Sequence, residues 1–156
     1  MLEKLERLAS EVAALHSKLI LLVGDPRAGK TAFLIAFGKR VESEPMNVGA
    51  ELGRRLAAIP QKQRHLQTST LLRELADQHA SGDLLLLDNL EILFDRTLQL
   101  DPLDLLKRHA RRVVAVWPGE LQGDTRTGRL TYADMGHPEH QDYGLAGLLP
   151  FRVQSQ

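Results

Sequence analysis

Residues 19–31 read LILLVGDPRAGKT, and this stretch decides the expected fold. Its first five residues are all apolar, which is typical of a buried parallel strand. Gly24 follows, and four residues later Gly29, Lys30 and Thr31 complete the pattern G-x-x-x-x-G-K-[ST] of a phosphate-binding loop. A helix-forming run, AFLIAF at 32–37, comes directly afterwards. Because the pattern stands between a strand and a helix, we predict a nucleotide-binding site here.

The parts of this loop have expected roles toward ATP and Mg²⁺, the two cofactors that the pattern predicts. Glycine lets backbone N–H groups turn toward phosphate oxygens, and the start of the following helix adds positive partial charge. Lys30 is expected on the β- and γ-phosphates, and the Thr31 hydroxyl is expected on Mg²⁺. The predicted nucleotide-binding residues form one continuous segment: Gly24, Asp25, Pro26, Arg27, Ala28, Gly29, Lys30, Thr31 and Ala32.

A second apolar run, LLLLD at 84–88, ends in a carboxylate. Such a run fits a strand buried on both faces, and ligands of parallel sheets bind at the carboxyl ends of the strands. We therefore predict Asp88 as the Walker B aspartate, a Mg²⁺ ligand together with Thr31.

The catalytic carboxylate is less obvious. ATPases of this kind usually carry Glu directly after the Walker B aspartate, but Asn89 stands there, and an amide cannot accept a proton from water. Glu91 is the nearest alternative and joins Lys30 and Asp88 as a predicted catalytic residue. The other interpretation of Glu91 is an exposed helix residue.

The remaining pattern predicts an α/β fold, with a parallel sheet of about five strands flanked by helices. Further strands are expected at 46–48, 113–117 and, as a short fifth strand, 130–132; helices are expected at 2–16, 50–58, 68–80 and 101–109. In AAA+ and STAND ATPases the strand after Walker B inserts between the Walker A and Walker B strands, and the strand at 113–117 is predicted to take that position. No helical lid is expected after the sheet. Trp117 then occupies the sensor position, although indole donates only one hydrogen bond. Residues 1–17 are expected as an amphipathic helix packed on a single P-loop NTPase domain, 18–153.

Other classes of phosphate-loop protein can be compared with the sequence. Ras-type GTPases carry Asp-x-x-Gly after Walker B and an Asn-Lys-x-Asp base reader, and both patterns are absent. Small nucleoside and shikimate kinases have this chain length but need an arginine-rich lid. The candidate lid at 121–129 offers only Arg126 and Arg129, so a small-molecule or nucleoside kinase remains an open alternative.

Composition excludes several other classes. Lys+Arg and Asp+Glu both number 20, so no overall field favours nucleic acid or membrane, and the absence of cysteine excludes disulfides and cysteine metal sites. No signal-peptide core or membrane-length apolar run is visible, so a cytoplasmic protein is expected. His137 and His140 do not have a zinc spacing and predict no metal site. The basic 54–65 segment is expected to be a solvated face; direct DNA contact is possible but not indicated, because no aromatic residues are interleaved with its charges.

Several motifs together resemble one family. VGDPRAGKT, NVGAELGRRL, LLLLDNLEILFD, VVAVWPG and LTYADMGHPE are similar to segments of the BrxF family, the small phosphate-loop proteins of type 3 BREX phage-defence systems, over about residues 5–143. The resemblance implies a bacterial ATPase-like component that works with other BREX subunits, including a larger ATPase. It also implies nucleotide and Mg²⁺ roles for Gly24, Gly29, Lys30, Thr31 and Asp88.

Two functions of different class therefore remain open at this point. The first is a slow or partner-stimulated ATPase, in which ATP drives self-association or binding to a larger subunit. Arg126 or Arg129 could then act as an arginine finger in a neighbouring subunit, although solvated loop arginines are the plainer interpretation. The second is a nucleotide-dependent adaptor that binds ATP and assembles partners with little hydrolysis.

Overall fold

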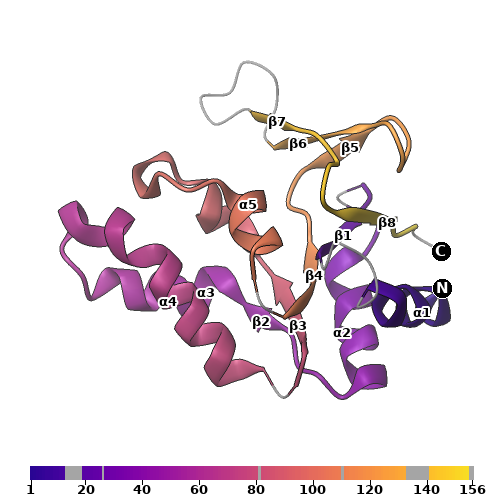
Figure 1. Cartoon of the computed structure of the whole chain (residues 1–156), viewed down its shortest axis with the longest axis horizontal. Helices are drawn as coiled ribbons and strands as arrows, with labels where there is room; N and C mark the ends of the chain where they lie inside the picture. Colours follow the sequence, from indigo (N-terminus) through magenta and orange to yellow (C-terminus); the bar gives the residue numbers. More distant parts are fainter. Residues whose placement is uncertain (13–18, 26, 81, 110, 133–140, 155–156) are drawn as a thin grey trace.

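The centre of the computed structural model is a five-stranded parallel sheet with the strand order β2-β3-β4-β1-β8 (Figure 1). The structure describes residues 1–12, 19–25, 27–80, 82–109, 111–132 and 141–154. β4 lies between β1 and β3, which is the position predicted for the strand at 113–117. The strands of this sheet are β1 (Leu19–Val23), β2 (Met46–Asn47), β3 (Leu84–Asp88), β4 (Arg112–Val116) and β8 (Leu149–Arg152).

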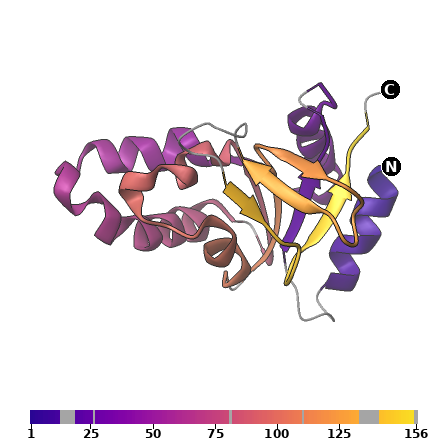
Figure 2. The ribbon, with the colours of Figure 1, turned by 90° about the horizontal axis from the view of Figure 1, so that it is seen from above.

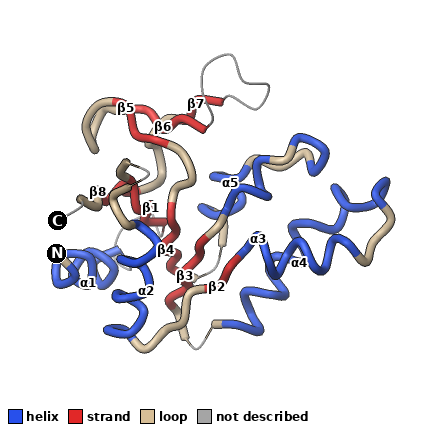
Figure 3. Tube along the Cα trace, turned by 180° about the vertical axis from the view of Figure 1, so that it is seen from behind, coloured by secondary structure: helices blue, strands red, loops and turns tan. Residues whose placement is uncertain are grey.

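Helices cover both faces of the sheet, as Figures 2 and 3 show from two further directions. α1 (Leu2–Val12) and α2 (Lys30–Val41) pack on one face, where Leu5 and Phe37 are fully buried against β1. The other face carries three α-helices and short 3₁₀ helices. These are α3 (Val48–Ala57), α4 (Arg64–His79), α5 (Pro102–Lys107) and the 3₁₀ helices Gln61–Gln63, Leu90–Phe94 and Arg96–Leu98.

The helix bounds follow from local capping chemistry. The Asn47 side chain accepts a hydrogen bond from the Ala50 N–H, so α3 begins two residues before the predicted start at 50. Asp101 caps α5 in the same way, and Pro102 occupies its first turn. α4 begins at Arg64 rather than at residue 68. The predicted N-terminal helix is described to Val12, and its last residues lie outside the described part.

One predicted strand forms, but in a different sheet from the one expected. Residues 130–132 were expected as the fifth strand of the parallel sheet, but β6 (Arg129–Tyr132) belongs to a separate antiparallel sheet with β5 (Glu120–Gln122) and β7 (Gln141–Tyr143). The chain leaves β4 at Pro118 and Gly119 and turns back on itself, so β6 pairs with its neighbours along the chain. The fifth parallel strand is β8, which contains Pro150 and can do so because it is an edge strand.

The small sheet lies beyond the carboxyl end of the parallel sheet (Figure 1). Aromatic side chains join the two sheets. Trp117, which follows β4, is fully buried, and its indole N–H donates to the Thr131 carbonyl oxygen at 3.2 Å. Phe94 stacks on Tyr132 with ring centroids 4.0 Å apart and meets Trp117 edge to face. This packing places residues 117–120 directly beside the loop that follows β1. None of the helices in the described residues has the length and apolar character needed to cross a membrane.

Candidate functional site

The loop of residues 24–31 (the 24–31 loop) follows the carboxyl end of β1, a strand that lies between β4 and β8 in the sheet. Gly29 has φ +78° and sits at the start of α2, a conformation that favours glycine. Gly24 has φ +156°, and a Cβ there would lie 2.5 Å from the Val153 carbonyl oxygen. Both glycines are therefore required by the backbone itself. Pro26 lies outside the described residues.

Thr31 and Asp88 meet across the sheet end, 57 residues apart in the chain. The Thr31 hydroxyl donates to the Asp88 carboxylate, with Oγ1 and Oδ1 3.3 Å apart. A hydroxyl and a carboxylate are the hard oxygen ligands that suit Mg²⁺, so these residues fit the ion that the sequence predicts. Within the described ranges, no group of three or more His, Asp or Glu side chains is placed to hold a metal ion. An ion at Thr31 and Asp88 would therefore take its other ligands from phosphate and water, which is common for Mg²⁺.

Lys30 is half-buried and reaches the segment that follows β4. Its ammonium donates to the Trp117 carbonyl oxygen at 2.9 Å and to the Gly119 carbonyl oxygen at 3.5 Å. Burial lowers the pKa of Lys30, and four carboxylates act on that pKa in the opposite direction: Glu120, Glu91, Asp25 and Asp88. One cation thus stands among four acidic side chains, so an anionic ligand would enter this site more readily together with a divalent cation.

Asn89 occupies the position where an ATPase of this kind usually has its catalytic glutamate. Its backbone is left-handed, with φ +59°, and its side-chain amide donates to Asn47 Oδ1 at 2.9 Å. Its carbonyl oxygen accepts a hydrogen bond from the Gly49 N–H at 3.0 Å. Asn89 therefore connects the end of β3 to the start of α3, and its amide N–H is already engaged.

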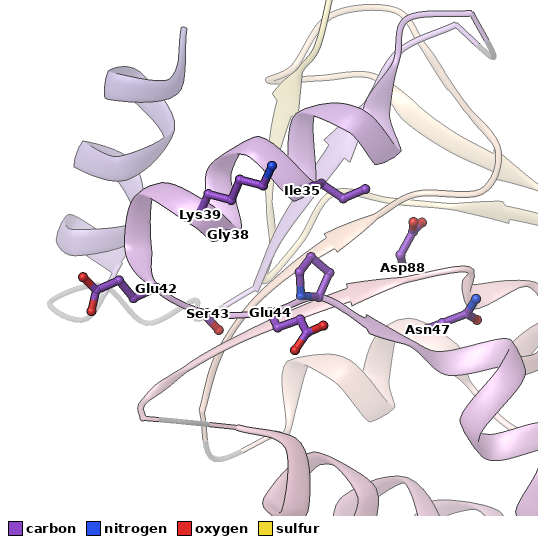
Figure 4. A pocket seen from close by; sticks show the side chains of 9 residues that line it. Ile35, Gly38, Lys39, Glu42, Ser43, Glu44, Asn47 and Asp88 are labelled. Atoms are coloured by element: carbon purple, nitrogen blue, oxygen red, sulfur yellow. The ribbon is translucent and has the colours of Figure 1, made fainter.

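A groove of about 610 Å³ runs from Asp88 along the exposed side of α2 (Figure 4). Figure 4 shows the Ile35 side chain of α2 pointing toward Asp88, with Asn47 on the same side of the groove as Asp88, whereas the Lys39 side chain lies along α2. Glu42 stands at the end of the groove far from Asp88. The groove gives a ligand or a partner direct access to the Thr31–Asp88 contact.

The other predicted site residues have varied surroundings. Ala28 is buried, and its N–H donates to the Asp25 carbonyl oxygen at 2.9 Å. Glu91 is exposed within the 3₁₀ helix Leu90–Phe94. Asp25, Arg27 and Ala32 are exposed on or next to the loop.

Three further residues had been considered for roles near the γ-phosphate: Trp117 as a sensor residue, and Arg126 or Arg129 as an arginine finger. The Trp117 side chain is buried under the small sheet, so it does not project from the strand end as a sensor residue would. Arg126 is exposed on the connection between β5 and β6, and Arg129 is exposed at the start of β6. Neither guanidinium bonds to a described residue. His137 and His140 lie outside the described residues.

The arginines of the basic 54–65 segment are engaged locally. Arg54 pairs with Glu51 at 3.2 Å, and Arg55 donates to the Gln78 side chain at 3.1 Å. Arg64 donates to the Ile59 carbonyl oxygen at 3.1 Å. These contacts agree with an ordinary solvated helix face.

The sequence did not predict that Glu120, Asn47 and the two carbonyl oxygens that accept hydrogen bonds from Lys30 would lie at this site. Glu120 comes first among the carboxylates that act on the pKa of Lys30, yet it belongs to the small sheet, which the sequence did not predict. Asn47 was assigned to a strand, although an Asn before a helix is a recognisable cap signal. The Pro118-Gly119 break was the visible sign that the chain turns close to the loop.

No protein-family model matches the chain, and no curated protein matches it. The interpretation of the site therefore depends on the loop glycines, the Thr31–Asp88 contact and the surroundings of Lys30.

Proposed function

We propose that this protein is a P-loop NTPase that binds Mg-ATP at the 24–31 loop and hydrolyses it slowly unless a partner stimulates it. The observation that carries the proposal is the contact between Thr31 Oγ1 and Asp88 Oδ1 at 3.3 Å. It joins the residue that ends the loop pattern to the carboxylate that ends β3. Two unrelated sequence signals would rarely meet at one sheet end by chance.

The topology supports the AAA+/STAND-like division of these proteins. β4 separates β1 from β3, which is the order expected for that division. The described residues that follow β4 form strands and turns and no helix, so they provide no helical lid. A nucleotide at the loop would thus be covered by the small sheet or by a partner.

The residues of this chain have distinct roles in the proposal. The loop N–H groups and the start of α2 would bind the phosphates, and Lys30 would balance their charge. Thr31 and Asp88 would hold Mg²⁺, which when bound neutralises charge on the phosphate oxygens. Lys30 already donates to the Trp117 and Gly119 carbonyl oxygens, so its ammonium is positioned before any nucleotide arrives.

Slow hydrolysis is proposed because the residue after Asp88 is an engaged amide. Asn89 donates to Asn47 and cannot take a proton from water. Glu91 and Glu120 are the carboxylates available near Lys30 for that role, and both are exposed. Arg126 and Arg129 are exposed, and their guanidinium groups bond to none of the described residues, so either could act as a finger toward a neighbouring subunit.

The biological setting follows only from the resemblance to the BrxF family. On that ground we propose a cytoplasmic component of a BREX phage-defence system that works with a larger ATPase subunit. The open groove of about 610 Å³ beside Asp88 is a suitable place for such a partner to reach the nucleotide site.

A second function is favoured by the contact between Asn89 and Asn47. Because this contact links β3 to the start of α3, occupancy of the nucleotide site could be transmitted to α3 without hydrolysis. The protein would then be an adaptor that assembles partners in an ATP-dependent way. Turnover separates the two functions, because an adaptor binds ATP with the same affinity but releases little phosphate.

Titration of ATP with Mg²⁺ into the purified chain tests the proposal, together with turnover at several protein concentrations. Lys30→Ala should weaken ATP binding about 100-fold, because the phosphates lose a charge-assisted donor. Lys62→Ala, which removes an exposed lysine far along the chain, is the control and should bind normally. Equal affinity in the Lys30→Ala variant would show that the loop is not a phosphate site.

A further inference from the structure

The turn that follows β4 (the 117–119 turn) is held on two sides by other parts of the protein. On one side, the Lys30 ammonium of the 24–31 loop donates to the Trp117 carbonyl oxygen at 2.9 Å and to the Gly119 carbonyl oxygen at 3.5 Å. On the other side, the Trp117 indole N–H donates to the Thr131 carbonyl oxygen of β6 at 3.2 Å. The turn therefore lies between Lys30 and the small sheet (Figure 1).

The small sheet is packed closely on this turn. Gly119 passes so near β6 that an added Cβ would collide with the Thr131 carbonyl oxygen. The Trp117 ring is fully buried and meets Phe94 and Tyr143 edge to face, with ring centroids 5.4 Å and 5.7 Å apart. Close-packed contacts of this kind transmit a displacement instead of absorbing it. A movement of the turn would therefore reach β6 and its neighbours in the small sheet.

A phosphate group at the 24–31 loop would compete with the 117–119 turn for Lys30. Phosphate oxygens are charged acceptors, and they bind an ammonium more strongly than neutral carbonyl oxygens do. Glu120 directly follows the turn, and it comes first among the carboxylates that oppose the lowering of the Lys30 pKa by burial. A phosphate would thus attract Lys30 and repel Glu120. Both effects would draw the loop and the turn apart, whereas the Trp117 backbone N–H stays fixed to the Leu22 carbonyl oxygen of β1 at 3.0 Å.

We propose that Lys30 couples nucleotide binding to the small sheet: a bound nucleotide draws the ammonium away from the Trp117 and Gly119 carbonyl oxygens, and the small sheet then loosens from the end of β4. A ligand can shift such an equilibrium because Lys30 makes different contacts in the two states. This regulation rests on the proposed function for its ligand, whereas the hold of Lys30 on the turn is present without a nucleotide. Of the two covers considered for the nucleotide, a loosened small sheet favours the partner.

Hydrogen exchange tests the hold of Lys30 in the protein without a nucleotide. Lys30→Met removes the donor but keeps a side chain of similar length, so the amides of β5 and β6 should exchange about tenfold faster than in the original protein. Lys4→Met, which replaces an exposed lysine of α1, is the matched control and should leave this exchange unchanged. The amides of α4 report in the same experiment that both variants are folded. The proposal is overturned if β5 and β6 exchange alike in the two variants.

A second measurement uses the original protein with Mg²⁺ and a non-hydrolysable ATP analogue, whose binding is measured separately by calorimetry. Trp117 is the only tryptophan of the sequence, so its fluorescence reports on the turn directly. The bound analogue should shift this emission to the red and speed exchange in β5 and β6 toward that of Lys30→Met. An analogue that binds but changes neither signal, or that slows the exchange, would overturn the proposal. Absence of binding would overturn the proposed function and the nucleotide response together, and calorimetry distinguishes that outcome from binding without a response.

Discussion

The two ends of the parallel sheet differ in how their polar groups are assembled. At the carboxyl end, the hydrogen-bond donors Lys30 and Thr31 are neighbours in the chain, and both already have acceptors within the protein. Thr31 donates to Asp88, and Lys30 donates to two backbone carbonyl oxygens. At the amino end, α4 and the turn after α5 supply the groups, and His109 Nε2 has no described partner. The polar groups at the carboxyl end therefore gather around one sequence motif, whereas those at the amino end are brought together only by packing.

The two ends also differ in charge. Lys30 stands among four carboxylates, whereas His109 has two arginines, Arg111 and Arg73, and one carboxylate, Asp77, around it. Substituting matched residues, one at each end of the sheet, tests whether the two ends differ in stability and in ligand binding.

Two glycines provide the first comparison. At Gly24 an added Cβ would lie 2.5 Å from the Val153 carbonyl oxygen, and φ is +156°; at Gly82 an added Cβ would meet nothing within 4 Å. Gly24→Ala should destabilise the protein by about 1–3 kcal/mol and weaken ATP binding, because β8 must move away from the loop. Gly82→Ala should stay within about 0.5 kcal/mol of the original protein. Urea unfolding measures both free energies of unfolding, and equal stability of the two variants would contradict a steric role for the close approach of Gly24 to Val153.

Two aspartates flank β3 and provide the second comparison. Asp88 ends the strand beside Thr31, and Asp83 precedes it and pairs with Arg112 at 2.9 Å. Asp88→Ala should reduce the affinity for Mg²⁺ about 10–100-fold in the ATP complex, because a hard oxygen ligand or its hydrogen-bonded neighbour is lost. Asp83→Ala should leave the Mg²⁺ dependence of ATP binding unchanged. If Mg²⁺ strengthens ATP binding equally in both variants, Asp88 only ends the strand.

Much of the fold could be predicted from local patterns. The apolar runs at 19–23, 84–87 and 113–117 appear as three adjacent parallel strands, because continuous apolar runs need burial on both faces. The small sheet could not be predicted in the same way. Its strands have three or four residues each, and β6 gave a strand signal without showing which sheet it would join. β8 was missed because Pro150 argues against a strand unless the edge position is known.

The same reasoning explains what could be predicted at each end of the sheet. The 24–31 loop and Asp88 could be predicted as a site because a phosphate-binding loop has a fixed spacing along the chain, and the Thr31–Asp88 contact agrees with that prediction. Glu120 and the polar groups around His109 could not be predicted. Arg73, His109 and Arg111 are brought together by the packing of α4 on the segment after α5, and no spacing in the sequence encodes that arrangement.

The last prediction concerns the amino end alone and has the smallest expected effect. Burial, Arg111 and Arg73 hold the pKa of His109 below its ordinary value of about 6.5, while Asp77 acts in the opposite direction. The unfolded chain therefore binds the His109 proton at higher pH than the folded chain does, so stability should fall as pH falls through about 6.5 and should stop falling below the folded pKa. His109→Asn keeps an oxygen acceptor for the Arg111 N–H but cannot titrate, so its stability should fall less over the same range. Urea unfolding between about pH 7.5 and pH 5 gives the difference, in which the other histidines cancel because both proteins contain them. Parallel stability curves would mean that His109 titrates as in the unfolded chain, and the contrast between the two ends of the sheet would then lose its electrostatic basis.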